Sequence, residues 1–135
     1  MGDAVRVDLS RRGEFLLAGV SGEIDLASAP ELVDAIESSL PRGTDGTSRV
    51  VIDLSEVGFL DSLGLEALVE LKRWLGERGV ELRVVSPPDR MVRQVFEITG
   101  LTEILRVAGS LDEALRPYMV KEGAAAPTIL PALAG

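Results

Sequence analysis

The stretch RVVIDLSEVGFLDSLGLEAL, residues 49–68, decides how this chain is expected to fold. Its first seven residues form a nearly continuous run of strand formers, which is typical of a central strand covered on both faces. After Asp61 and Ser62 the spacing becomes helical and predicts a helix over residues 63–78 that stops at Gly79. The segment therefore indicates a strand followed by a helix, with an acidic residue and a hydroxyl at the junction.

The predicted helix has an apolar arc, which also contains Gly64. A glycine on this arc, with no side chain, lets the helix approach a sheet closely. Leu63 and Trp74 lie on a shoulder between the apolar and the charged sides. Either one alone fits the half-buried edge of the core better, and together they indicate a hydrophobic part of a partner surface. The apolar arc holds four leucines: Leu65, Leu68, Leu71 and Leu75.

The remaining elements follow from the same patterns. Ser28 and Glu31 are spaced as a capping box for the first helix, and Ser86 or Asp89 is expected to cap the third. Gly100 is expected to end that third helix. Strands are expected at residues 4–10, 14–24, 80–86 and 103–107, and further helices at residues 28–40, 86–100 and 110–118.

This order of elements predicts an α/β fold. The first two strands are expected to form a hairpin or a meander, and the later alternation of strand and helix requires right-handed crossovers between parallel strands. We therefore expect a single domain at residues 1–120, with a mixed, mostly parallel sheet of about five strands and about four α-helices packed against it. Residues 121–135 are expected to form a flexible C-terminal tail.

Composition narrows the chemistry. The chain of 135 residues has 46% hydrophobic and 27% charged residues, the balance of a soluble globular protein. It has no cysteine, which excludes disulfides, thiolate nucleophiles and structural zinc sites of the usual kind, and no histidine, which excludes a Ser-His-Asp triad. No phosphate-binding glycine motif occurs. We therefore expect no catalytic residue, no cofactor and no metal site.

The charge indicates which partners to expect. A net charge of −8 argues against direct binding of nucleic acid, and no apolar run is long enough to span a membrane, so a cytoplasmic location is expected. From Gly22 to Gly46 six acidic residues occur against one basic residue, Arg42. This acidic segment is suited to bind a basic patch on a partner protein.

Three stretches of the sequence resemble a known family. GEID at residues 22–25, VVIDLSEVGFLDSLGLEAL at residues 50–68 and VRQVFEITGLTEIL at residues 92–105 resemble a STAS domain, in order and over about residues 4–116. This family includes the bacterial anti-sigma factor antagonists and the cytoplasmic tails of sulfate transporters. In the antagonists a phosphorylated serine directly follows an aspartate.

The resemblance implies roles for particular residues. Ser62, preceded by Asp61, matches the phosphorylated serine, and Asp25 matches an acidic residue on a neighbouring loop that contacts the partner kinase. Leu63 departs from the small residue usual after the serine, which bears on partner choice more than on phosphorylation. The partner-binding residues expected on this basis and from the helix shoulder are Asp25, Asp61, Leu63 and Trp74.

The resemblance also implies a function. The unphosphorylated form would bind an anti-sigma factor that is itself a serine-protein kinase and so release its sigma factor. Phosphorylation at Ser62 would end that binding, and a metal-dependent serine phosphatase would restore it. The protein itself would not be an enzyme, and a monomer or weak dimer is expected.

Other readings stay open at this point. Ser62 is also placed as an ordinary helix cap, and Asp61 as a charge beside the helix dipole. The chain is alternatively a STAS scaffold or sensor whose serine is never phosphorylated. A carboxylate-dependent hydrolase is a remote further alternative.

Overall fold

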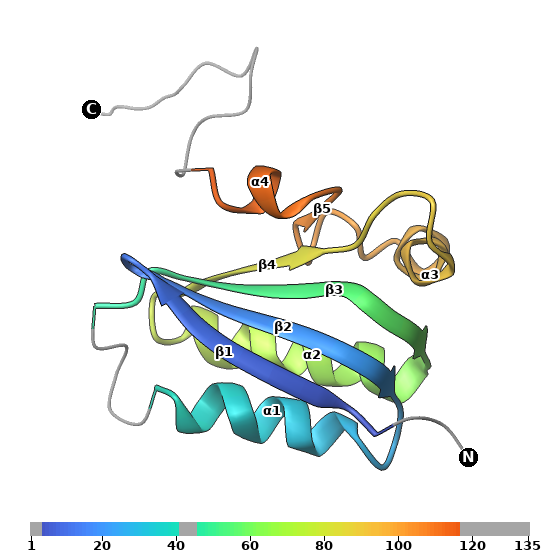
Figure 1. Ribbon diagram of the computed structural model, residues 1–135, viewed down its shortest axis with the longest axis horizontal. Helices are drawn as coiled ribbons and strands as arrows, with labels where there is room; N and C mark the ends of the chain where they lie inside the picture. The colour runs from blue at the N-terminus through green and yellow to red at the C-terminus, as the bar shows by residue number, and fades with distance from the viewer. Residues whose placement is uncertain (1–3, 41–45, 117–135) are drawn as a thin grey trace.

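A five-stranded sheet in the order β1-β2-β3-β4-β5 forms the middle of the fold (Figure 1). The structure is a computed structural model that describes residues 4–40 and 46–116. β1 pairs antiparallel with β2, and all other neighbours pair in parallel, so the expected hairpin and mostly parallel sheet are confirmed. The strands are β1 Arg6–Arg12, β2 Phe15–Ile24, β3 Arg49–Leu60, β4 Glu81–Val85 and β5 Val107–Ala108; the helices are α1 Ala29–Ser38, α2 Ser62–Gly76, α3 Met91–Thr99 and α4 Leu111–Ala114.

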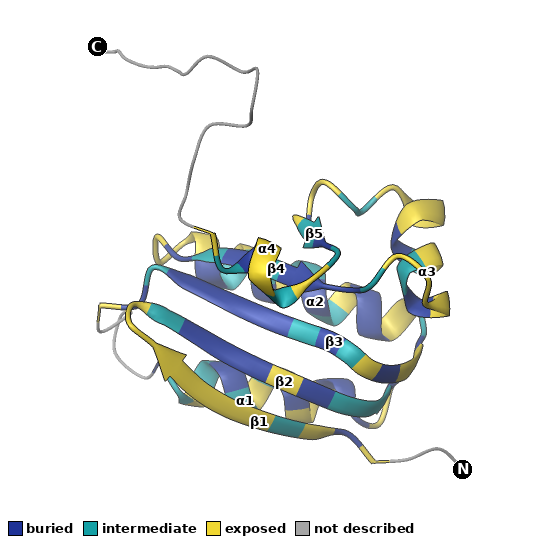
Figure 2. Cartoon of the chain, turned by 45° about the horizontal axis from the view of Figure 1, so that its top comes forward, coloured by how far each residue is buried: buried dark blue, intermediate teal, exposed yellow. Residues whose placement is uncertain are grey.

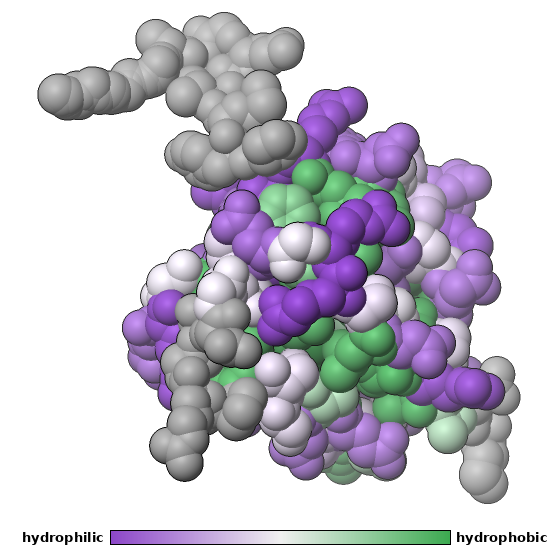
Figure 3. Space-filling view, turned by 60° about the vertical axis from the view of Figure 1, so that its left-hand side comes forward, coloured by the Kyte–Doolittle hydropathy of each residue, from purple (hydrophilic) through white to green (hydrophobic). Residues whose placement is uncertain are grey.

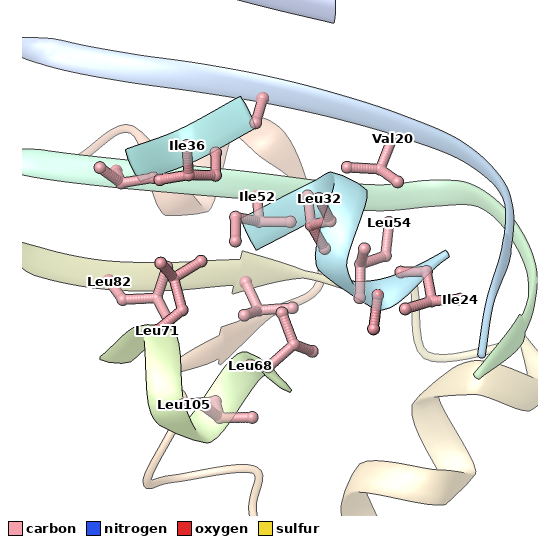
Figure 4. Close-up of a cluster of buried hydrophobic side chains, with 14 of the residues drawn as sticks. Val20, Ile24, Leu32, Ile36, Ile52, Leu54, Leu68, Leu71, Leu82 and Leu105 are labelled. Atoms are coloured by element: carbon pink, nitrogen blue, oxygen red, sulfur yellow. The ribbon is translucent and has the colours of Figure 1, made fainter. Parts of the chain in front are cut away.

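The helices α1 and α2 lie side by side on one face of the sheet (Figure 1). Their apolar stripes bury Leu32 and Ile36 of α1 and the four leucines of the predicted arc of α2. Figure 4 shows Leu32 and Ile36 of α1 and Leu68 and Leu71 of α2 gathered with side chains from three neighbouring strands, Val20, Ile52 and Leu82. This layer is the main core, and it fixes where the first turn of α2 sits relative to the ends of β2 and β3.

The opposite face of the sheet has a smaller core under α4. Arg49, only 2% exposed, crosses this region: it is paired with Glu81 at 2.9 Å and its guanidinium lies 4.4 Å from the centre of the Phe15 ring. It also donates to the backbone carbonyls of Ala114 and Arg116. One buried cation therefore joins β3 to the end of α4. The apolar residues of this core are Leu17, Val51, Val85, Ala108 and Ala114.

Figure 2 shows that β3 is mostly buried while β1, at the sheet edge, is mostly exposed. The expectation of a central strand covered on both faces is therefore confirmed for residues 49–55. Seen from the end of the molecule that carries the β1–β2 turn, hydrophilic side chains surround apolar areas (Figure 3). No helix among the described residues is long and apolar enough to cross a membrane.

The capping box expected at the start of α1 is wrong. Ser28 does precede the helix, but its hydroxyl makes no cap hydrogen bond to α1 and instead donates to the Glu23 carbonyl at 2.7 Å. The Ser28 N–H donates to the carboxylate of Asp25 at 3.1 Å. The hydroxyl oxygen accepts from the Asp25 N–H at 2.9 Å in the loop before the helix, and this hydrogen bond takes the place of the cap.

Two further details differ from expectation. Arg90 in an extended conformation precedes α3, while Ser86 and Asp89 make no cap, because residues 87–90 form a turn that the Arg90 N–H closes by donating to the Pro87 carbonyl at 3.2 Å, and the helix begins only after it. The strand expected at residues 103–107 is reduced to residues 107–108, since the residues before it form turns that end at Arg106 with a φ of 51°. Gly100, with a φ of 76°, ends α3 as expected.

Candidate functional site

The junction between β3 and α2 is capped by Asp61. Its carboxylate accepts a hydrogen bond from the Gly64 N–H at 2.9 Å, and its carbonyl accepts one from the Leu65 N–H at 3.0 Å. The reading of Ser62 as the helix cap is therefore wrong, and the cap role falls to the residue before it. This frees the Ser62 hydroxyl from a structural task at this junction.

Ser62 is the first residue of α2 and is exposed. Its hydroxyl forms no hydrogen bond with the part of the chain that the structure describes. The N–H groups of a first helical turn have no partner within the helix, and the helix dipole favours negative charge there. An exposed hydroxyl at this position is accessible to a kinase and stands where a phosphate is tolerated.

The loop that carries Asp25 is bonded directly to this junction. The Asp61 N–H donates to the Ile24 carbonyl at 3.3 Å, and Ile24 pairs with Leu60 in the sheet. Residues separated by more than thirty positions in the sequence are thereby held at one edge of the sheet. The structure thus places Asp25 directly after β2, and Asp61 and Ser62 directly after β3, at the neighbouring carboxyl ends of these two strands.

Gly64 is what allows this approach. A Cβ atom built there would lie 2.5 Å from the Leu60 Cδ1 atom and 2.8 Å from the Ile24 carbonyl oxygen. The second of these atoms belongs to the backbone and cannot rotate away. The expectation that Gly64 serves close packing of the helix is confirmed, and the segment it packs against is the one that leads to Asp25.

Asp25 is held rigidly by its own turn. Its carboxylate accepts from the Ala27 N–H at 3.0 Å and the Ser28 N–H at 3.1 Å, and the Ser28 hydroxyl lies 3.0 Å away. The Ser28 backbone N–H donates to the charged form and holds the pKa of Asp25 below its usual value, and the Ser28 hydroxyl adds to this with a proton that it shares between the Asp25 carboxylate and the Glu23 carbonyl. The carboxylate is therefore a fixed negative charge near Ser62.

Exposed apolar side chains surround the junction. Leu63 is 39% exposed, which agrees with the shoulder position expected for it. Leu26 and Phe59 are 69% and 46% exposed, and sequence reasoning missed both. All three lie within three residues of the Ile24–Leu60 pair, so they border the same edge of the sheet. Phe59 was hidden inside a strand pattern, and Leu26 stands alone in a turn without any periodicity to mark it.

Trp74 lies elsewhere. It is twelve residues after Ser62 on the same helix, about 18 Å along the axis. It is half-buried, packs partly against the main core, and has the Arg78 guanidinium 3.8 Å from its ring centre. It lines a small groove between α1 and α2. The structure therefore brings Asp25, Asp61, Ser62 and Leu63 together and leaves Trp74 at a separate place.

The described residues contain no cluster of three or more acidic side chains arranged to hold a metal ion. The chemistry available at the junction is that of an exposed hydroxyl, two carboxylates and apolar side chains. Such a set suits recognition by another protein, with the hydroxyl as the group that can be modified.

Comparison with known proteins agrees with the fold described above. A family model described as the STAS domain matches residues 6–114. The chain is 31% identical over 103 residues to the anti-sigma-B factor antagonist of Staphylococcus aureus strain NCTC 8325, covering 76% of this chain and 92% of that protein. It is 29% identical over 104 residues to the anti-sigma-B factor antagonist of Bacillus subtilis strain 168, covering 77% and 91%.

A solved structure is similar as well. The crystal structure of an anti-sigma factor antagonist from Mycobacterium paratuberculosis has a TM-score of 0.73 and 32% sequence identity, and the match covers 84% of this chain and 92% of that one.

Proposed function

This chain belongs to the STAS domain family, and we propose that it is an anti-sigma factor antagonist whose binding is switched off by phosphorylation of Ser62. The observation that carries the proposal is the exposed hydroxyl of Ser62 on the first residue of α2, with the cap role taken by Asp61. The similar proteins are named as regulators, which is why we do not propose the hydrolase alternative.

The partner of the unphosphorylated form is proposed to be an anti-sigma factor that is also a serine kinase. It would dock over the edge of the sheet that carries Asp25 and Ser62, with the bordering side chains Leu26, Phe59 and Leu63 supplying apolar contact. The sigma factor held by that partner would then be released. A metal-dependent serine phosphatase would regenerate the binding form, and all of these events are proposed to take place in the cytoplasm.

The phosphate acts on the interface rather than on the fold. It adds a charge of about −1.5 to −2 next to two carboxylates, Asp25 and Asp61, at a helix N-terminus that favours negative charge. A partner surface shaped for a hydroxyl must then desolvate a dianion, which opposes binding by several kcal/mol. Since each 1.4 kcal/mol is about tenfold in affinity, a micromolar or nanomolar complex dissociates.

The test is phosphorylation by each serine kinase of the anti-sigma type from the same organism, followed by intact-mass analysis. We expect a gain of about 80 Da that maps to Ser62, and loss of kinase binding in the modified protein. Ser62→Ala should fold normally and keep binding in the presence of ATP, while Ser62→Asp should bind weakly. Ser38→Ala, which changes another exposed serine on α1, is the matched control and should behave as the wild type.

Two results would contradict the proposal: phosphate on another residue, or equal binding before and after modification of Ser62. A chain that binds an anti-sigma factor but is never modified would instead support the scaffold or sensor alternative. The reason to test that alternative is Leu63: this exposed leucine stands where a small residue is usual in the antagonists, so a kinase would meet a different surface beside Ser62.

A further inference from the structure

A groove of about 150 Å³ lies between α1 and α2, at the end of α2 far from Ser62. Val33, Leu71 and the indole of Trp74 provide its apolar surface. This volume is smaller than the roughly 300–1,000 Å³ usual for a small-molecule site, so the groove suits a single side chain presented by another protein. Its other lining residues are charged: Glu37, Glu70, Arg73 and Glu77.

The charges of the groove favour a cation. Three carboxylates line it against one guanidinium, and that guanidinium, Arg73, is already paired with Glu70. Glu37, half-buried on α1, takes part in none of the ion pairs among the described residues. A partly buried carboxylate beside an indole is an arrangement that binds ammonium and guanidinium groups.

The Trp74 ring already stacks with one guanidinium, from Arg78, which does not line the groove. Arg78 lies 3.8 Å from the ring centre and donates to the Trp74 carbonyl at 2.9 Å. Arginine combines a planar group that stacks on aromatic rings with donors that fit carboxylates, whereas lysine offers only a point charge. We propose that this groove is a docking site for an arginine side chain on a partner protein, held between the Trp74 indole and the carboxylate of Glu37.

The position of the groove makes it a second contact on the same side of the molecule as the phosphorylation junction. Leu63 and Trp74 are eleven residues apart on α2, so they differ by only about 20° around the helix and by about 16 Å along it. A standard interface covers about 800 Å² on each partner, enough to span that distance. The groove therefore offers a contact that phosphorylation of Ser62 does not touch.

The groove can be tested without any known partner. Because Trp74 is the only tryptophan in the chain, the full-length protein labelled with 5-fluorotryptophan gives a single ¹⁹F resonance from this site. N-acetyl-arginine methylamide is titrated against it, with N-acetyl-citrulline methylamide as the neutral probe of the same shape. We expect a saturable shift with the arginine probe and at least threefold weaker binding of the citrulline probe.

Two variants sharpen the result. Glu37→Gln should weaken binding of the arginine probe about threefold, the size expected for losing one partly exposed ion pair. Asp34→Asn makes the same charge change on α1 outside the groove and should leave the affinity unchanged. Equal binding of both probes, no saturable shift, or an unchanged affinity in Glu37→Gln would overturn the proposal.

The docking role is then measured on a complex, and this step alone rests on the proposed function. An anti-sigma factor that binds the wild-type chain should bind Glu37→Gln about threefold more weakly and Asp34→Asn equally well. Equal binding to wild type and Glu37→Gln would overturn docking at the groove and leave the proposed function standing. If no anti-sigma factor binds the wild type, the proposed function fails, and the arginine titration decides on the groove.

Discussion

Replacing Gly64 with alanine should destabilise the fold, although alanine is the better helix former. In the middle of a helix the exchange stabilises by about 1 kcal/mol, and Gly64, the third residue of α2, would gain at most that much. Here the new methyl group would lie 2.8 Å from the Ile24 carbonyl oxygen and 2.5 Å from the Leu60 side chain, both closer than real contacts allow. Overpacking of this kind costs about 1–3 kcal/mol, and the backbone atom cannot rotate away.

We therefore expect a net loss of about 2 kcal/mol in the free energy of unfolding and a fall in Tm of roughly 5–10 °C. Urea and thermal unfolding followed by circular dichroism measure both quantities. Gly76→Ala is the matched control in the same helix, because a Cβ atom there meets nothing within 4 Å, and its stability should stay equal or rise. If Gly64→Ala were as stable as the wild type, the reasoning that Gly64 sets the approach of α2 to β2 would be refuted.

Three more changes test the parts that hold the site. Asp61→Ala should lose about 1 kcal/mol of stability in urea unfolding because the Gly64 N–H loses its cap, and Asp61→Asn, which keeps an acceptor, should lose clearly less. Ser28→Ala should raise the pKa of Asp25 toward its ordinary value of 3.8, measured by NMR of the carboxyl carbon. Because the pKa of Asp25 is lower in the folded than in the unfolded wild type, its ionised carboxylate stabilises the fold at a pH above the unfolded pKa, and this stabilisation is lost as the pH falls through the folded pKa. The stabilisation should be smaller in the variant. Arg49→Met should cost about 2 kcal/mol in urea unfolding because it leaves the backbone carbonyls of Ala114 and Arg116 without their donor, whereas Glu81 keeps its other arginine partners; a cost under about 1 kcal/mol would contradict this.

The order of the elements could be read from the sequence because it depends on local periodicity. The apolar run at residues 49–55 and the leucines at helical spacing in α2 each report which face is buried, and the alternation of strand and helix leaves few topologies. The position of Ser62 between a strand and a helix was predictable in the same way. Residues 121–135, for which a flexible tail is expected, lie outside the described residues.

The hydrogen-bond partners of the capping residues could not be predicted from the sequence. Which of Asp61 and Ser62 caps α2, and whether Ser28 caps α1, depends on where a carbonyl or an N–H of another segment comes to lie. Asp61, Ser62 and Ser28 are all of good N-cap types, so propensity alone does not decide which of them makes a cap. The packing of α1 and α2 against the sheet makes the choice.

The composition of the site was decided in the same manner. The sequence by itself determined that a hydroxyl lies between the central strand and the helix after it, and that Asp25 follows an earlier strand pattern. Only the tertiary structure decided that the Ile24 carbonyl meets the Asp61 N–H, that Leu26 and Phe59 stay exposed beside them, and that Trp74 belongs to a different groove. The physical reason is that periodicity reports which side of an element is buried, whereas contacts between elements depend on packing between residues far apart in the chain.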